Sequence, residues 1–158
     1  MHGVTSDGLV LSNAFLHPSG MVKKTVSLGV IYGMRLREMR IINNLSQPEL
    51  GAQIGVHRGF ISQAESGARN LSIDTLEKFF SALLPEESLA MSLRQRLANN
   101  VLSARSALNI SQEALSEKSG TSVNYVYRVE NGLVNTALSK IQLLAKALEV
   151  DGLWLLEG

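Results

Sequence analysis

Cysteine is absent from the 158 residues of the chain, which excludes zinc fingers, zinc ribbons, iron–sulfur clusters, thiol catalysis and disulfide scaffolds. Aromatic residues make up only 5% of a chain that is 45% hydrophobic. A core built chiefly from aliphatic side chains favours helices over a β-sandwich or barrel. The chain also lacks an excess of either charge, because 15 Lys and Arg stand against 14 Asp and Glu. Any contact with DNA must therefore come from a local patch.

Long hydrophobic runs are missing as well. The longest early apolar stretch, 26–32, is interrupted by polar residues and glycine and is far shorter than the roughly 20 residues of a membrane span. The N-terminus lacks the pattern of a signal peptide, so we expect a cytoplasmic protein without a membrane partner. Common enzyme signatures are absent, and the three histidines have no carboxylates at ligand spacing. We expect neither an enzyme nor a cofactor or metal site.

The sequence repeats itself at an offset of 65 residues. Segment 46–67 aligns without gaps with segment 111–132, and shared apolar positions extend the match on both sides. A gapless register of turn residues and core positions predicts a tandem duplication of one small helical unit. The identical pairs are Arg40/Arg105, Ser46/Ser111, Gln47/Gln112, Leu50/Leu115, Gly55/Gly120, Glu65/Glu130, Gly67/Gly132, Asn70/Asn135 and Ala82/Ala147.

Each unit is predicted to contain four main helices. Serines at 46 and 111 are expected N-caps, because a Ser oxygen accepts the free N–H groups of a helix start. Glycines at 55 and 120 are expected to end the second helices. A last apolar segment, 153–156, is expected to fold back as a lid on the second unit. The predicted helices are about 33–43, 47–54, 57–65 and 72–84 in the first unit, and about 89–108, 112–119, 122–130 and 137–148 in the second.

The repeat also sets the predicted domain boundaries: a flexible N-terminal arm over 1–25, a first unit over 26–85 and a second unit over 86–158. Part of the segment before Met21 is alternatively interpreted as an over-long start rather than as arm. The junction at Pro85 is short, and proline fits the first turn of a helix. We therefore expect the two units to be held at a fairly fixed angle.

Two short helices joined by a glycine turn within a four-helix unit are typical of a helix-turn-helix. Segments 33–40, 45–51 and 61–67, and more closely 110–116, 128–132 and 143–148, resemble the phage repressor/Cro family. The resemblance implies an all-α fold of two tandem lambda-repressor-like domains with four or five helices each. It also implies a sequence-specific DNA-binding regulator of transcription, a repressor of phage, plasmid or mobile-element type.

The resemblance further implies which residues contact DNA. In the family, a glutamine after the cap of the second helix reaches the DNA backbone and braces the third, recognition helix. The second, third and seventh residues of the recognition helix contact bases. Arg pairs with guanine and Gln or Asn with adenine, whereas valine contacts a thymine methyl group. The corresponding residues here are the bracing Gln47 and Gln112, the base-contacting Arg58, Gly59, Gln63, Val123, Asn124 and Arg128, and the flanking His57, Ser62, Ser122 and Tyr127.

Several features carry two interpretations. The arginines at 40 and 105 could contact DNA or form internal ion pairs with the glutamates at 65 and 130, and the resemblance favours the ion pairs. The Lys23-Lys24 pair fits a solvated surface better than a minor-groove arm. Aromatic residues at helical spacing fit core or interface positions better than a stacking platform; these are Phe60, Phe79, Phe80 and Tyr125.

Double-stranded DNA is the expected partner, with the promoter of the protein's own gene as the first candidate operator. We expect a homodimer, whose four recognition helices would cover repeated or inverted half-sites. In one alternative, only one unit contacts bases and the other dimerises through 153–156 with Trp154 as an anchor. In another, the chain is an antitoxin or anti-activator that binds a protein, an interpretation that the near-neutral charge favours.

Overall fold

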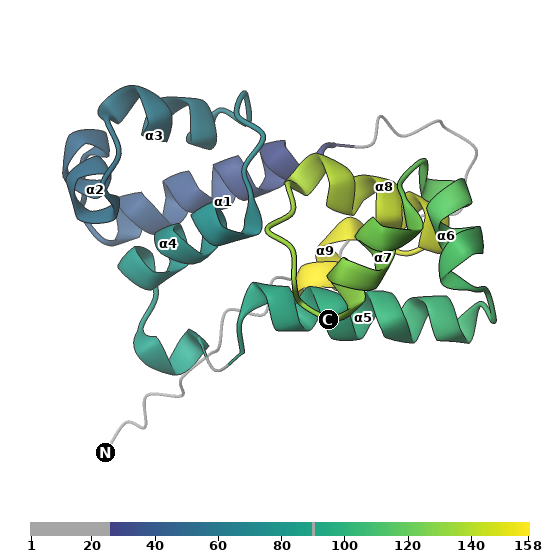
Figure 1. Ribbon diagram of the computed structural model, residues 1–158. Helices are drawn as coiled ribbons and strands as arrows, with labels where there is room; N and C mark the ends of the chain where they lie inside the picture. The colour runs from purple at the N-terminus through teal and green to yellow at the C-terminus, as the bar shows by residue number, and fades with distance from the viewer. Residues whose placement is uncertain (1–25, 90) are drawn as a thin grey trace, which may run out of the picture.

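The computed structural model describes residues 26–89 and 91–158, and its regular elements over these ranges are all helical. The all-α prediction is confirmed (Figure 1). The predicted arm, with Met21, Lys23-Lys24 and two of the histidines, lies outside the described residues. The elements are α1 (Leu28–Ile42), α2 (Gln47–Ile54), α3 (Arg58–Glu65), α4 (Ile73–Leu83), the short 3-10 helix η1 (Glu86–Leu89), α5 (Leu93–Ala107), α6 (Gln112–Ser119), α7 (Val123–Glu130), α8 (Leu138–Leu148) and α9 (Gly152–Glu157).

Helices α1 to α4 begin and end 65 residues before α5 to α8, so the duplication holds at every one of these helix boundaries. Similar local signals produce the shared ends. The side chains of Ser46 and Ser111 accept backbone N–H bonds at the starts of α2 and α6. Gly55 (φ 75°) and Gly120 (φ 66°) end the same helices in the left-handed conformation that glycine adopts without strain.

Both predicted first helices had the wrong start. Helix α1 begins at Leu28 rather than near residue 33, because Ser27 caps it by accepting from the backbone N–H of Val30. Helix α5 begins at Leu93 rather than at residue 89, since Ser92 caps it in the same way. Residue 89 instead ends η1. The two caps lie 65 residues apart, so the repeat offset itself relates them.

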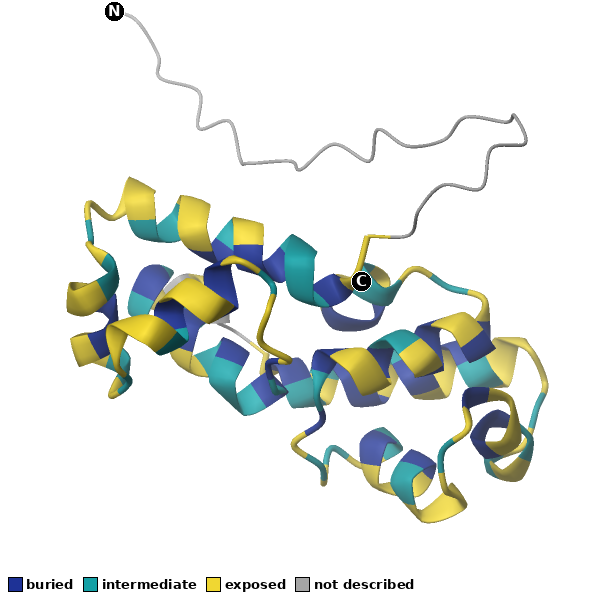
Figure 2. Cartoon of the chain, turned by 90° about the horizontal axis from the view of Figure 1, so that it is seen from above, coloured by how far each residue is buried: buried dark blue, intermediate teal, exposed yellow. Residues whose placement is uncertain are grey.

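The core of each unit is made from equivalent positions on all four main helices. Leu36, Leu50, Ile61 and Leu76 are buried in the first unit, and their counterparts Val101, Leu115, Val126 and Ile141 in the second. Burial of each such side chain contributes roughly 1.5–3 kcal/mol. Figure 2 shows buried residues along inward-facing sides of the helices and exposed residues outside.

The predicted lid is confirmed, and it does more than cover the second unit. Leu155 and Leu156 of α9 are buried, and α9 packs on α5 and α8. The carboxylate of Glu157 also accepts a hydrogen bond of 2.9 Å from the Tyr32 hydroxyl of α1. Helix α9 therefore links the second unit to the first.

The two units contact each other directly, α1 lying against α8 and α4 against α5. Among the described helices, none combines the length and the hydropathy needed to cross a membrane.

Candidate nucleic-acid interface

Helix α3 carries the polar face expected of a recognition helix. Its inner side is anchored by Ile61 and Ala64, which are fully buried. The expected DNA-contacting residues of this segment, His57, Arg58, Gly59, Ser62 and Gln63, are all exposed. The local sequence thus fixes the helix by its apolar side and leaves the polar side open to a partner.

The His57 side chain is already engaged within the protein. Nδ1 of His57 accepts a 3.2 Å hydrogen bond from the backbone N–H of Phe60, so the imidazole caps α3. A Cβ atom at Gly59 would lie 3.1 Å from that Nδ1. The missing side chain at this expected base-contacting position therefore leaves space for the histidine cap.

Sequence reasoning missed Arg69, which follows α3 in the loop before α4. Its guanidinium lies 4.6 Å from the centre of the Phe60 ring, and Nη1 donates a 3.3 Å hydrogen bond to Oε1 of Gln63. Arg69 is exposed, so it adds a positive charge beside the expected base-contacting face. No sequence signal distinguishes this loop arginine from an ordinary solvated one.

Arg37 of α1 was also missed. It is exposed, and it lines a hollow beside α3 together with Gln47, Ser62 and the Arg40–Glu65 pair. A cation next to a recognition helix can neutralise a DNA phosphate. The α1 sequence alone does not reveal this placement, because the hollow exists only once α1 packs against α3.

Helix α7 repeats the framework with a different outer face. Ser122 caps it by accepting from the backbone N–H of Tyr125, and Val126 and Val129 are buried. The remaining expected contact residues, Val123, Asn124, Tyr127 and Arg128, are exposed. Hydrophobic side chains thus occupy two of the exposed positions on this helix.

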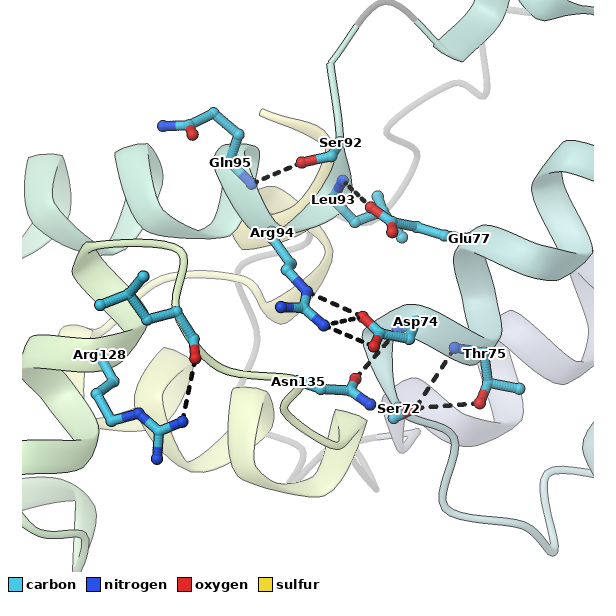
Figure 3. A network of polar contacts seen from close by, with 11 residues as sticks. Ser72, Asp74, Thr75, Glu77, Ser92, Leu93, Arg94, Gln95, Arg128 and Asn135 are labelled. Atoms are coloured by element: carbon cyan, nitrogen blue, oxygen red, sulfur yellow. Dashed lines mark hydrogen bonds and ion pairs between the residues drawn. The ribbon is translucent and has the colours of Figure 1, made fainter.

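Arg128 and Tyr125 are tied to the loop after α7. Nη2 of Arg128 donates a 3.1 Å hydrogen bond to the backbone oxygen of Leu133 (Figure 3). The Tyr125 hydroxyl bonds the Thr136 hydroxyl, and Nζ of Lys140 lies 4.9 Å from the centre of the Tyr125 ring. Burial raises the pKa of Tyr125. With Phe79 buried and Phe60, Phe80 and Tyr125 partly buried against the core, the expectation of packing positions is confirmed.

The bracing role predicted for the two glutamines is confirmed. Nε2 of Gln47 donates to Oε2 of Glu65 over 3.0 Å, and Nε2 of Gln112 donates to Oε2 of Glu130 over 2.6 Å. Each bond ties the first residue of α2 or α6 to the last residue of the recognition helix.

The internal ion pairs are confirmed too. Nε of Arg40 lies 2.5 Å from Oε1 of Glu65, and Arg105 pairs with Glu130 at the same distance. The glutamate side chains are only 4% exposed. Burial opposes ionisation of Glu65, but hydrogen bonds from Arg40 and Gln47 outweigh it, so the pKa of Glu65 lies below its usual value. These arginines hold the scaffold together.

The described residues contain no group of three or more His, Asp or Glu arranged to hold a metal ion. The geometry presents two exposed helix faces, one on α3 packed against α1 and α2 and one on α7 packed against α5 and α6. Arg37, Arg58 and Arg69 lie at the first face.

Comparison with protein families matches the helix-turn-helix family over residues 36–83 and 101–155. Control protein C.BamHI of Bacillus amyloliquefaciens is 37% identical over 60 residues, which are 37% of this chain and 74% of that protein. Control protein C.SmaI of Serratia marcescens is 45% identical over 61 residues, 39% of this chain and 73% of that protein. The crystal structure of a hypothetical transcription factor, NHTF from Neisseria, is 40% identical with a TM-score of 0.41, covering 46% of this chain and 80% of that one.

Proposed function

The chain belongs to the helix-turn-helix family, and from that premise we propose that this DNA-binding regulator of transcription is a sequence-specific repressor of phage, plasmid or mobile-element type. A protein seated in the major groove over a promoter blocks polymerase without needing a second interaction. We place its action in the cytoplasm, on double-stranded DNA.

One observation carries the proposal: the exposed side chains on the first recognition helix differ chemically from those on the second, although the two helices are held by equivalent scaffolds. Arg58 and Gln63 can form paired hydrogen bonds with guanine and adenine, and Asn124 and Arg128 offer the same chemistry in a different order. Val123 offers a methyl contact to thymine. All five are exposed. A merely structural duplication would not need distinct polar groups at these positions.

The test is a titration of the purified chain against the DNA upstream of its own gene, beside a scrambled duplex at near-physiological salt. We expect a preference of about 10³ or more for the upstream DNA, the usual order for specific sites. Ser103→Ala is a matched control, since Ser103 is exposed on α5 and belongs to neither α3 nor α7. Equal, weak and strongly salt-dependent binding to both duplexes would count against an operator in that DNA.

We also propose that two chains associate on long operators, so that a homodimer presents four recognition helices. Trp154, which is 39% exposed on α9, is a candidate anchor for such a contact. A footprint limited to a single half-site would contradict this arrangement.

A second candidate function is capture of a protein, as in an antitoxin or anti-activator. The hydrophobic exposure on α7 favours it: Tyr127 is 50% and Val123 37% exposed. Residues 86–158 also carry seven Lys and Arg against eight Asp and Glu. Val123→Ser with Tyr127→Ser should abolish protein capture under this function, whereas Asn124→Ala with Arg128→Ala should lower operator preference under the first.

A further inference from the structure

Contacts between the two units come in reciprocal pairs. Where a residue of one unit contacts a residue of the other, their counterparts 65 residues away contact each other as well. The backbone N–H of Ile73 donates to the oxygen of Thr136 over 2.9 Å, and that of Leu138 donates to the oxygen of Leu71 over 2.8 Å. Each donor is the repeat counterpart of the other donor, and each acceptor of the other acceptor. Between them, an antiparallel bridge joins Ser72 to its own counterpart Ala137.

Side chains follow the same rule beside the bridge. Oδ1 of Asn135 accepts from the backbone N–H of Asp74 over 3.1 Å, and Oδ1 of Asn70 accepts from that of Ser139 over 3.2 Å. The asparagines are counterparts, as are the two donors. Figure 3 shows the first bond of this pair, between Asn135 and the start of α4.

A third reciprocal pair lies farther from the bridge. Oε1 of Gln142 accepts from the backbone N–H of Leu28 over 3.3 Å, and Oε1 of Glu77 accepts from that of Leu93 over 2.7 Å. All three pairs satisfy backbone donors in the first turn of a helix, groups that have no partner within their own helix. The helix starts therefore supply a set of reciprocal contacts between the units.

Reciprocal contact, in which residue i meets j and the counterpart of i meets the counterpart of j, is the property of a two-fold axis. Since α1 to α4 each have an equal counterpart, the axis relates the units as wholes and passes between Ser72 and Ala137. It consequently relates α3 to α7, which lie on either side of the region where α4 and α8 begin (Figure 1).

We propose that one chain is the covalent equivalent of a two-fold dimer, and that it binds one operator made of two inverted, non-identical half-sites. The inference rests on the proposed function. Two-fold helix-turn-helix pairs bind inverted half-sites about one helical turn, roughly 34 Å, or a multiple of it apart. Here Arg58 and Gln63 would specify one half-site, whereas Val123, Asn124 and Arg128 would specify the other.

Two further observations support this assignment. Because 60 residues are 74% of C.BamHI, that relative is about half as long as this chain, the length of one unit. In addition, some contacts across the axis have no counterpart. Nε of Arg94 donates to Oδ1 of Asp74 over 2.9 Å, but the repeat places Gly29 and Ser139 at the matching positions. A first unit against a second unit therefore makes an ion pair that two identical units could not make.

The experiment selects duplexes from a randomised pool with the full chain and weighs the resulting complex by native mass spectrometry. We expect two dissimilar half-sites in inverted orientation at fixed spacing, with one chain bound to each inverted pair. Selection of one half-site, a direct repeat, or two chains on one inverted pair would overturn the inference and leave the proposed function standing. Selection of no sequence would overturn the proposed function and the inference with it.

Single substitutions sharpen the result. Arg58→Ala should relax base preference by about ten- to a hundredfold in one half-site only, and Asn124→Ala in the other half-site only; Ser103→Ala should change neither. A single substitution that relaxed both half-sites would mean that two chains present the same unit, and would overturn the inference.

Inserting five base pairs between the half-sites should weaken binding by about 10²-fold or more, because the two half-sites could no longer be bound together. Unchanged affinity after that insertion would also overturn the inference.

Discussion

The two recognition helices differ more than the scaffolds that hold them. Helices α3 and α7 begin and end at equivalent positions and bury equivalent inner sides. Each also ends in a glutamate held by an arginine and a glutamine, a clamp formed by Arg40, Gln47 and Glu65 in the first unit and by Arg105, Gln112 and Glu130 in the second. Their outer sides share none of the expected base-contacting residues: Arg58 stands against Val123, and Gln63 against Arg128. Packing constrains the inner side, because a core position must be apolar and of the right size. The outer side is free to vary, and we propose that specificity is encoded there.

The largest expected effect tests whether the two clamps are equivalent. Glu65→Ala should lower the free energy of unfolding by about 3–5 kcal/mol, because it leaves a charged arginine without its partner in a largely buried position, and Glu130→Ala should cost about as much. Urea denaturation of each variant measures this, with the exposed Glu38→Ala as the control. A loss confined to one unit would show that the clamps differ despite their equal geometry.

The next largest effect concerns a difference between α1 and α5, the first helix of each unit. A Cβ atom at Gly33 would lie 2.6 Å from the backbone oxygen of Ala64, whereas the second unit carries Ala98 at the same position. Gly33→Ala should therefore destabilise the protein by about 1–3 kcal/mol, because α1 and α3 pack too closely for the added methyl group. Thermal denaturation checks the value, and Ser81→Ala on the exposed side of α4 is the control. An unchanged melting temperature would mean that α1 can move away from α3 to the distance that separates α5 from α7.

DNA binding should also distinguish the units. Arg58→Ala should weaken binding to the operator by about 1–3 kcal/mol. Arg128→Ala should cost less, because its guanidinium must first give up its bond to Leu133, whereas no hydrogen bond among the described residues uses that of Arg58. Fluorescence anisotropy titrations measure both. A loss of binding free energy at Arg128 equal to or larger than that at Arg58 would contradict this prediction.

The smallest expected effect concerns the contact that lacks a repeat counterpart. Arg94→Ala should lower the free energy of unfolding by less than about 1 kcal/mol, since the Arg94 and Asp74 side chains are 33% and 40% exposed and such pairs contribute little in water. Denaturation at low and at high salt should show the difference shrinking as salt rises. A salt-independent loss above that value would assign the pair a larger part in holding the two units together.

The sequence predicted the duplication, the all-α class and the second, third and fourth helices of each unit, because these depend on local signals. Serine caps, glycine ends and apolar spacing are written in the chain itself. The clamp was also accessible, since Arg40, Gln47 and Glu65 recur at the same offsets in the second unit. The starts of α1 and α5 were missed for different reasons. Ser27 lies upstream of the predicted first helix, whereas Ser92 lies inside the predicted helix, because Leu89 extends the apolar spacing of α5 by one turn beyond the cap.

Only the tertiary structure decided how the units meet. Asn70 and Asn135 are an identical pair in the sequence, yet nothing local indicates that each contacts a helix start in the opposite unit. Arg37 and Arg69 likewise gain their place beside α3 from packing. The physical reason is the same in each case. A cap or an apolar stripe acts within a few residues, whereas an axis between two units is set by contacts between residues far apart in the chain.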